Sequence, residues 1–233
     1  MSQEAHHQQV FFGFELTDTT RLAISALFFQ IAEDNTQPNL SAEAAAVVST
    51  LIDAAMDAFY YEIMQEVRAH PTAKRSADAG INTVSKGSHL VVKKMVNSLE
   101  PEELEIFAVC LDGMLLDLSG KTYLALPLPD TLVHDIEQSI YRIRNDADTQ
   151  AYNRMIVSAL CDLAELAAQF FYQKPTRMFK VRPFIRKSAD LGILTVTKGA
   201  QFVIKQLFKK THQGELIKFS HMLEQKLIYF QTE

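Results

Sequence analysis

The sequence predicts an all-α protein built from two copies of one roughly four-helix unit, about eight helices in all, with the copies packed in pseudo-twofold symmetry. Two observations lead to this class. The stretch KRSADAGINTVSKG, which begins at Lys74, returns as RKSADLGILTVTKG, which begins at Arg186, an offset of 112. Apolar residues also recur at helical spacing along most of the chain, and no segment alternates convincingly with the period of two expected for a strand.

The similarity between the two halves extends beyond this stretch at the same offset. It includes Leu16 to Asp18 with Leu128 to Asp130, Phe59–Tyr60 with Phe171–Tyr172, and Glu103–Leu104 with Glu215–Leu216. No insertion or deletion between the halves is needed. We therefore expect a mobile tail at residues 1–10, a first repeat unit at 11–118, a linker at 119–122 and a second unit at 123–230.

Each unit is expected to begin with an apolar lead-in that has no regular structure, at residues 11–16 and 123–128, because prolines interrupt the second copy. Thr17 or Asp18 then caps a first helix, whose counterpart opens at Asp130. The second helix runs from Ser41 until Pro71 ends it. Its counterpart is expected to end near residue 173.

The fourth helix of the first unit is expected to begin around Pro101, a favoured residue for a first turn, and to end at Gly120. Its apolar stripe includes Leu111 and Leu115. The matching helix begins at Gly214–Glu215.

The third segment of each unit contains the repeated stretch and four of the chain's eight glycines: Gly80, Gly87, Gly192 and Gly199. Helix propensity favours an extended linker here, whereas the spacing of the apolar residues favours one continuous helix. We expect the helix. The glycines then form a groove of small residues that permits a close helix crossing, with the same groove of the other copy as its partner.

Composition is that of a globular chain: 233 residues, of which 48% are hydrophobic and 22% charged. Cys110 and Cys161 do not occupy equivalent positions, so we expect two free thiols in a reducing compartment rather than a disulfide or a metal site. No apolar run has the features of a secretion signal or the length of a membrane span. We expect a cytoplasmic protein without a cofactor and without a membrane partner.

No catalytic pattern stands out. The seven histidines share no repeated position, and the Glu-x-x-His spacing of a carboxylate-bridged metal pair is absent from the expected helices. In the fragment at 79–85, Gly80 and Thr83 stand too close together for the turn and new N-cap of a DNA-binding helix-turn-helix. The aromatic clusters at 59–61 and 170–172 could line a ligand pocket, but filling a core is the commoner role. The residues do not decide whether the protein is an enzyme, but the lack of a catalytic pattern favours a protein that is not one.

Charge is where the two halves differ most. The first unit has 7 basic and 16 acidic residues (net -9), and the second has 15 basic and 10 acidic residues (net +5). The basic excess concentrates in a run without acidic residues, which contains Lys174, Arg177, Lys180, Arg182, Arg186 and Lys187. It continues at Lys198, Lys205, Lys209 and Lys210. Such segregation favours docking to an anionic partner, or to the acidic unit of the same or another chain.

We therefore expect an interaction or regulatory protein that binds an anionic partner through the basic surface of the second unit, with a protein partner or self-association as the leading forms of binding. Nucleic acid is an alternative partner, although a sequence pI of 5.8 counts against it. An enzyme or small-ligand binder with a site in the cleft between the repeats is a second alternative.

Overall fold

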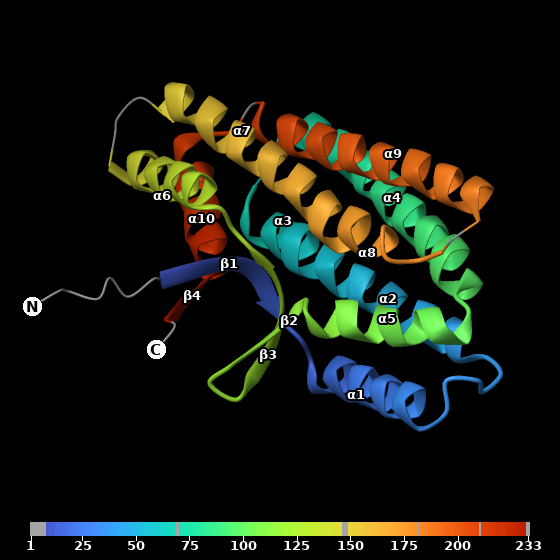
Figure 1. The fold of residues 1–233 in the computed structure, drawn as a ribbon. Coiled ribbons are helices and arrows are strands. Elements are labelled where there is room, and N and C mark those ends of the chain that lie inside the picture. The colour runs from blue at the N-terminus through green and yellow to red at the C-terminus, as the bar shows by residue number, and fades with distance from the viewer. Residues whose placement is uncertain (1–7, 69, 146–148, 181, 210, 232–233) are drawn as a thin grey trace, which may run out of the picture.

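The computed structural model describes residues 8–68, 70–145, 149–180, 182–209 and 211–231. The protein is mostly helical and also contains a small four-stranded sheet (Figure 1). The prediction of a mainly helical chain is confirmed, but the prediction of an all-α fold is wrong.

The sheet consists of β1 (Gln8–Glu15), β2 (Leu115–Leu118), β3 (Lys121–Pro127) and β4 (Leu227–Gln231). Its order is β2-β3-β1-β4, and every neighbouring pair is antiparallel. The two central strands pair with Gly13 opposite Ala125. A β-carbon at Gly13 would lie 2.4 Å from the carbonyl oxygen of Leu124, so glycine is required by the close approach of β3.

The strands correct several expectations. Both apolar lead-ins are strands. Pro127 does not prevent this, because it is the last residue of β3, where a missing N–H costs little. Residues 8–10 of the expected tail belong to β1, and residues 1–7 lie outside the described residues. Of the expected linker at 119–122, residues 119 and 120 form the tight turn between β2 and β3, and residues 121 and 122 belong to β3. Ser119 and Gly120 both have positive φ there, 53° and 80°, as a two-residue hairpin turn requires.

Helices form the rest of each half. The first half contains α1 (Asp18–Glu33), α2 (Leu40–Met56), the π-helical turn η1 (Asp57–Tyr61), α3 (Glu62–Glu66), α4 (Pro71–Met95), the 3-10 turn η2 (Val96–Ser98) and α5 (Pro101–Asp112). The second half contains α6 (Asp130–Asn145), α7 (Thr149–Ala168), the π-helical turn η3 (Gln169–Gln173), α8 (Lys174–Thr176), α9 (Pro183–Phe208) and α10 (Gln213–Gln225). Gly120 therefore does not end α5, which stops at Asp112.

Local sequence explains where these helices start. The Thr17 side chain accepts the N–H of Thr20 at the start of α1. Glu100 and Glu103 form a capping box at the start of α5, where Pro101 occupies the first turn. Of the two candidate caps it is Thr17 that caps α1, and Pro101 lies in the first turn as predicted, whereas Pro71, predicted to end a helix, begins α4.

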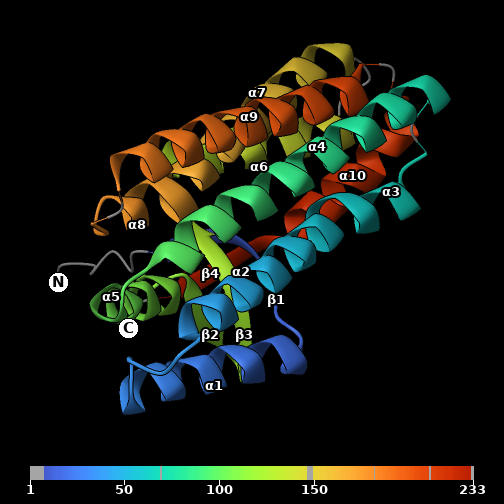
Figure 2. The ribbon, with the colours of Figure 1, turned by 90° about the vertical axis from the view of Figure 1, so that its right-hand side faces the viewer.

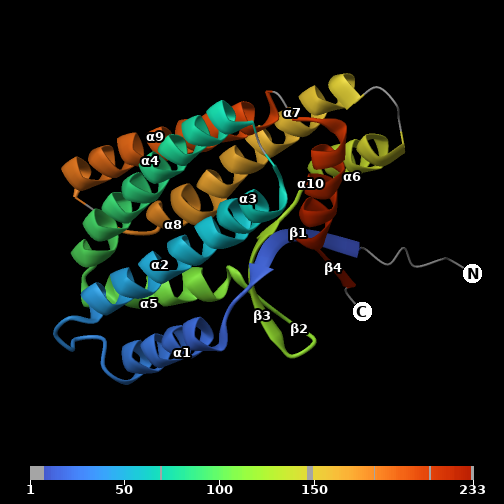
Figure 3. The same cartoon turned by 180° about the vertical axis from the view of Figure 1, so that it is seen from behind.

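The long helices α4 and α9 lie side by side and run antiparallel as one outer layer (Figure 2). Beneath them, α2 packs against α4 and α7 packs against α9. The sheet lies on the other side of α2 and α7, where the ring of Phe59 stacks on Phe12 at 4.9 Å and meets the ring of Phe14 edge-on at 5.3 Å. The terminal strands β1 and β4 pair with each other (Figure 3).

The hydrophobic cores draw on both halves of the chain. One is built on α1, α2 and α5, and it also contains Tyr172, Phe179 and Ala189 from the second half. Another is built on α6, α7 and α10, and it also contains Val10 and Val67 from the first half. A third, smaller cluster lies between α4 and α9. Neither half buries its apolar residues without the other.

Candidate functional site

The repeated stretches form the centre of the α4/α9 layer. Each lies within one continuous helix, which confirms the prediction from apolar spacing. A β-carbon added at a glycine would meet a valine Cγ2 of the facing helix: Gly80 and Val203 at 2.6 Å, Gly192 and Val91 at 2.5 Å, Gly87 and Val196 at 2.9 Å, and Gly199 and Val84 at 2.9 Å. At all four positions a larger side chain would push the helices apart.

The basic connection between α8 and α9 is held against the first half of the protein by one of its phenyl rings and one of its backbone N–H groups, and not by its positive charges. Phe179 is 7% exposed and belongs to the core built on α1, α2 and α5. The backbone N–H of Lys180 donates to Oε1 of Glu103, whose carboxylate is buried and also accepts the N–H of Glu100. This part of the connection is therefore fixed, and its lysine ammonium groups are not needed for the anchoring.

Arg186 acts within the connection rather than on its surface. Its Nη2 donates to the carbonyl oxygens of Thr176 at 2.9 Å and Phe179 at 2.7 Å. Its Nε is buried without a hydrogen-bond partner among the described residues. Of the six basic residues predicted to form an interaction surface, Arg186 is thus occupied with backbone carbonyls.

The side chains of the other five are exposed. The ammonium nitrogen of Lys174 lies 5.5 Å from the centre of the Phe170 ring. Arg177 and Lys180 belong to the connection between α8 and α9. Arg182 is the N-cap residue of α9, and Lys187 lies in its second turn. The structure therefore spreads these charges along the connection and the start of α9.

The predicted continuation of the basic run at Lys198, Lys205 and Lys209 lies on α9 and its C-terminal end, beside α4, and Lys210 lies outside the described residues. Sequence reasoning missed that these lysines share one side of the helix. We define the basic face as the exposed cationic residues of α9 and its two ends: Arg182, Lys187, Lys198, Lys205 and Lys209. Lys187, Lys198 and Lys205 recur at steps of eleven and seven along the chain, a spacing that returns to one side of a helix. Lys86 and Lys93 of the neighbouring helix α4 are also exposed. The steps of eleven and seven between Lys187, Lys198 and Lys205 were the signal by which the sequence could have predicted this face.

The charge of this layer is opposite to that of the protein. Together α4 and α9 contain nine basic and two acidic residues, net +7, in a chain of net -5, which leaves -12 on the remainder. The two acids, Asp78 and Asp190, each accept a tyrosine hydroxyl: Tyr60 at 2.6 Å and Tyr172 at 2.9 Å. Burial, followed by these bonds, raises the pKa of both tyrosines, so they remain neutral donors.

An open groove of about 580 Å³ lies between α7, α8 and α9. Its lining includes Glu165, Arg177, Arg186 and Asp190. The groove lies within the second half and not between the halves, where a ligand site was the alternative expectation. Within the described ranges no group of three or more His, Cys, Asp or Glu side chains is placed to hold a metal ion.

The helical stretch Asn153–Thr176 is long and apolar enough to cross a membrane by length and composition, contrary to the expectation from the sequence. In this fold it consists of residues 153–168 of α7, η3 and α8, and α7 packs against α6 and α9. The exposed side chains of α7 are all polar where the structure describes them: Arg154, Ser158, Asp162 and Glu165. They form a water-facing stripe along the helix.

Comparison with models of protein families, with curated proteins and with solved structures gave no match.

Proposed function

We propose that this is a non-enzymatic interaction protein that binds an anionic partner through the basic face. The observation that carries the proposal is a row of cations without counter-ions. Lys187, Lys198 and Lys205 are exposed, and none of them forms an ion pair with any residue that the structure describes. Such a row gives this face a positive potential, which attracts an anionic partner.

Helix energetics do not explain the position of Arg182. Arg182 is the N-cap residue of α9 and makes no side-chain cap. Positive charge at a helix N-terminus is unfavourable by roughly 0.3–1 kcal/mol because it opposes the helix dipole. At the same place in α4, His70 accepts the N–H of Thr72. Selection for something other than helix stability accounts for an arginine at this position.

We further propose that the fold is a tandem duplication of a unit of roughly four helices, packed with pseudo-twofold symmetry. Contacts that recur at the offset of 112 support it. The Glu103 carboxylate accepts the N–H of Lys180, and the Glu215 carboxylate accepts the N–H of Arg68 at 2.6 Å. The π-helical turns η1 and η3 begin at positions related by the same offset, and so do α4 and α9. The basic face is then a feature that distinguishes the second copy from the first.

Polyanion binding tests the proposed function. Replacing Lys187, Lys198 and Lys205 together by glutamine should lower the salt concentration at which the protein leaves an immobilised sulfated polysaccharide, because fewer counter-ions are released on binding. A matched control replaces Lys121, Lys218 and Lys226, which lie elsewhere and each form an ion pair, at 2.7, 3.3 and 2.9 Å. If both variants elute alike, or the parent protein is not retained, the basic face is not a binding surface.

A further inference from the structure

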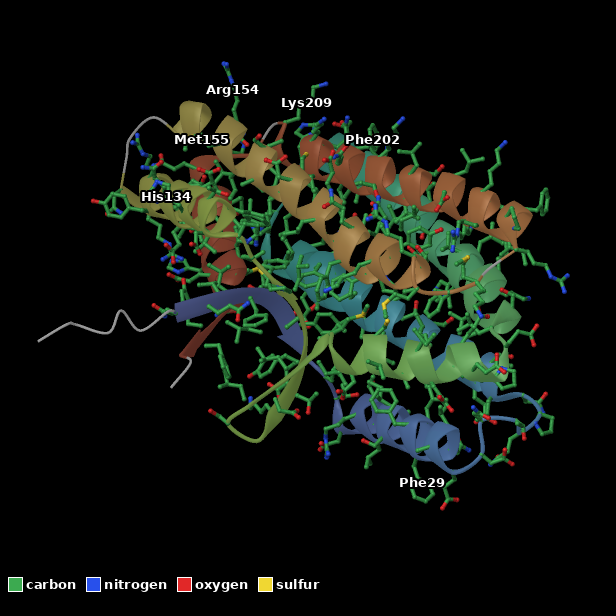
Figure 4. All side chains as sticks on the ribbon, viewed as in Figure 1. Phe29, His134, Arg154, Met155, Phe202 and Lys209 are labelled. Atoms are coloured by element: carbon green, nitrogen blue, oxygen red, sulfur yellow. The ribbon has the colours of Figure 1, made fainter. Side chains whose placement is uncertain are left out.

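The basic face is interleaved with large apolar side chains that are largely or partly exposed; the ring of Phe202 also lies against Gly80 of α4. On α9, Phe184 is 84% exposed, Leu191 59%, Leu194 49% and Phe202 46%. Figure 4 shows Phe202 and Lys209 pointing outward from this side of the bundle. At the equivalent positions of the first half, α4 has Thr72, Ala79, Asn82 and Leu90. The apolar row is therefore mainly a property of α9.

Helical geometry places both sets of side chains on the outer side of the layer. The inner side of α9 is defined by Gly192, Gly199 and Val203, which meet α4. Phe184, Leu191 and Phe202 follow each other at steps of seven and eleven, like the lysines of the basic face, and so return to one side of the helix. Leu90 of α4 is 54% exposed in the same layer. The result is a two-helix surface on which phenyl and leucyl groups stand between ammonium groups.

Three kinds of occupant can be compared by their chemistry. A second copy of the same surface would bring two cationic layers together, which is unfavourable. A nucleic-acid duplex would match the lysines, but its phosphates offer nothing to the side chains of Phe184 and Leu191. An anionic bilayer surface matches both, because lysines meet lipid phosphates while phenylalanine and leucine enter the boundary between headgroups and acyl chains.

We propose that the outer face of α9, with Leu90 and Lys86 of α4 beside it, lies flat on an anionic membrane surface. This inference rests on the proposed function and names its partner. The acidic remainder of the protein, net -12, is repelled by the same surface, so one orientation is favoured. The binding is peripheral: the lysine stems extend their ammonium groups toward the headgroups, and no helix crosses the bilayer.

Sedimentation with vesicles measures the binding. The full chain should bind vesicles that contain phosphatidylserine and should not bind phosphatidylcholine alone. Replacing Lys187, Lys198 and Lys205 by glutamine should weaken binding about fivefold per lysine. Replacing Phe184, Leu191 and Phe202 by serine should weaken it at least about tenfold. The matched control replaces Leu22, Phe29 and Val109, which are 59%, 63% and 69% exposed elsewhere, by serine and should bind as the parent protein does.

Insertion can be seen directly because the chain contains no tryptophan. The emission of a single tryptophan in Phe202→Trp should shift to shorter wavelength on anionic vesicles and be quenched by labelled acyl chains. Phe29→Trp, on α1, should show neither effect. Unchanged emission from Phe202→Trp, or equal binding by the serine variant and the parent, overturns membrane insertion.

The same samples separate the two proposals. Binding to the sulfated polysaccharide or to duplex DNA without binding to anionic vesicles leaves the proposed function standing and overturns the membrane partner. If the protein binds none of the three, both are overturned.

Discussion

The Cγ2 methyl of Val91 lies directly over Gly192, where a β-carbon would be only 2.5 Å away. Because such a distance is shorter than van der Waals contact, this pair fixes how closely α4 and α9 approach. The crossing can also be tested directly, because Val91 and Gly192 can be substituted separately.

Gly192→Ala should destabilise the protein by about 1–3 kcal/mol through overpacking, although alanine favours helix by about 1 kcal/mol over glycine. Urea unfolding followed by circular dichroism measures the loss. Gly214→Ala is the control, because nothing lies within 4 Å of a β-carbon there. The double variant Val91→Ala/Gly192→Ala should lose less stability than the sum of the losses measured for the two single variants. Simple additivity would show that the two residues do not oppose each other.

Glu103→Ala should destabilise the protein by about 2–4 kcal/mol, because it leaves the backbone N–H groups of Lys180 and Glu100 without their charged acceptor. The change also releases the connection from α5, so limited proteolysis should become faster near Lys180. Glu102→Ala, one residue earlier and exposed, is the matched control and should change unfolding little. Equal stability of the two variants would contradict the anchoring role of Glu103.

Acid should weaken the corresponding contact in the second half. The backbone N–H of Arg68 is the main reason that the pKa of Glu215 is held below its ordinary value of 4.5, and Lys218 adds to it. A carboxyl group whose folded pKa is lowered stabilises the fold above its unfolded pKa and loses that contribution as the pH falls through the folded pKa. Glu215→Gln should therefore flatten the decline of the denaturation midpoint below about pH 4.5. An unchanged pH profile would contradict the contact.

Both cysteines should react slowly with alkylating reagents at neutral pH while the protein is folded. Burial raises the pKa of the thiols of Cys110 and Cys161, which lowers the fraction present as the reactive thiolate. Cys161 is buried and Cys110 partly exposed, so Cys161 should be the slower. Mass spectrometry of iodoacetamide adducts, with and without urea and with glutathione as reference, measures this. Labelling of the folded protein at the glutathione rate would refute it.

The helices could be read from the sequence because their signals are local. Thr17 and Pro101 mark helix starts through their own chemistry, and the apolar spacing within 77–95 outweighed the poor propensity of its glycines. Glycine is a poor helix former, but at Gly80 and Gly192 it allows the facing valines to approach closely, and this packing offsets the low helix propensity.

The sheet could not be read because its strands are short and their signals are ambiguous. Leu115 and Leu227 fall on the same apolar stripe as the helices that precede them, yet each begins a strand. Over such short stretches, helical and extended patterns differ too little to be separated. These strands are stabilised by pairing with strands that are distant in the sequence, as Phe12 of β1 pairs with Leu227 of β4.

The candidate surface was found in part. Charge counting identified Lys187 and the run before it, but it could not tell that Arg186 binds two backbone carbonyls or that the connection is anchored through Phe179. Those contacts depend on which distant elements meet. The rest of the apolar row on α9 was missed for the same reason, since Leu191 and Phe202 are recognisable as exposed only once the inner side of the helix is known.

The sharing of core residues between the halves sets the order in which a growing chain can fold. Phe179 completes the core built on α1, α2 and α5, so that core stays open until the ribosome has made most of the second half. β1, near the start, obtains its last neighbour only when β4 emerges. Long-range pairing of this kind slows folding and leaves apolar surface exposed meanwhile. The nascent chain therefore keeps part of its apolar surface in contact with water until the second half has been made.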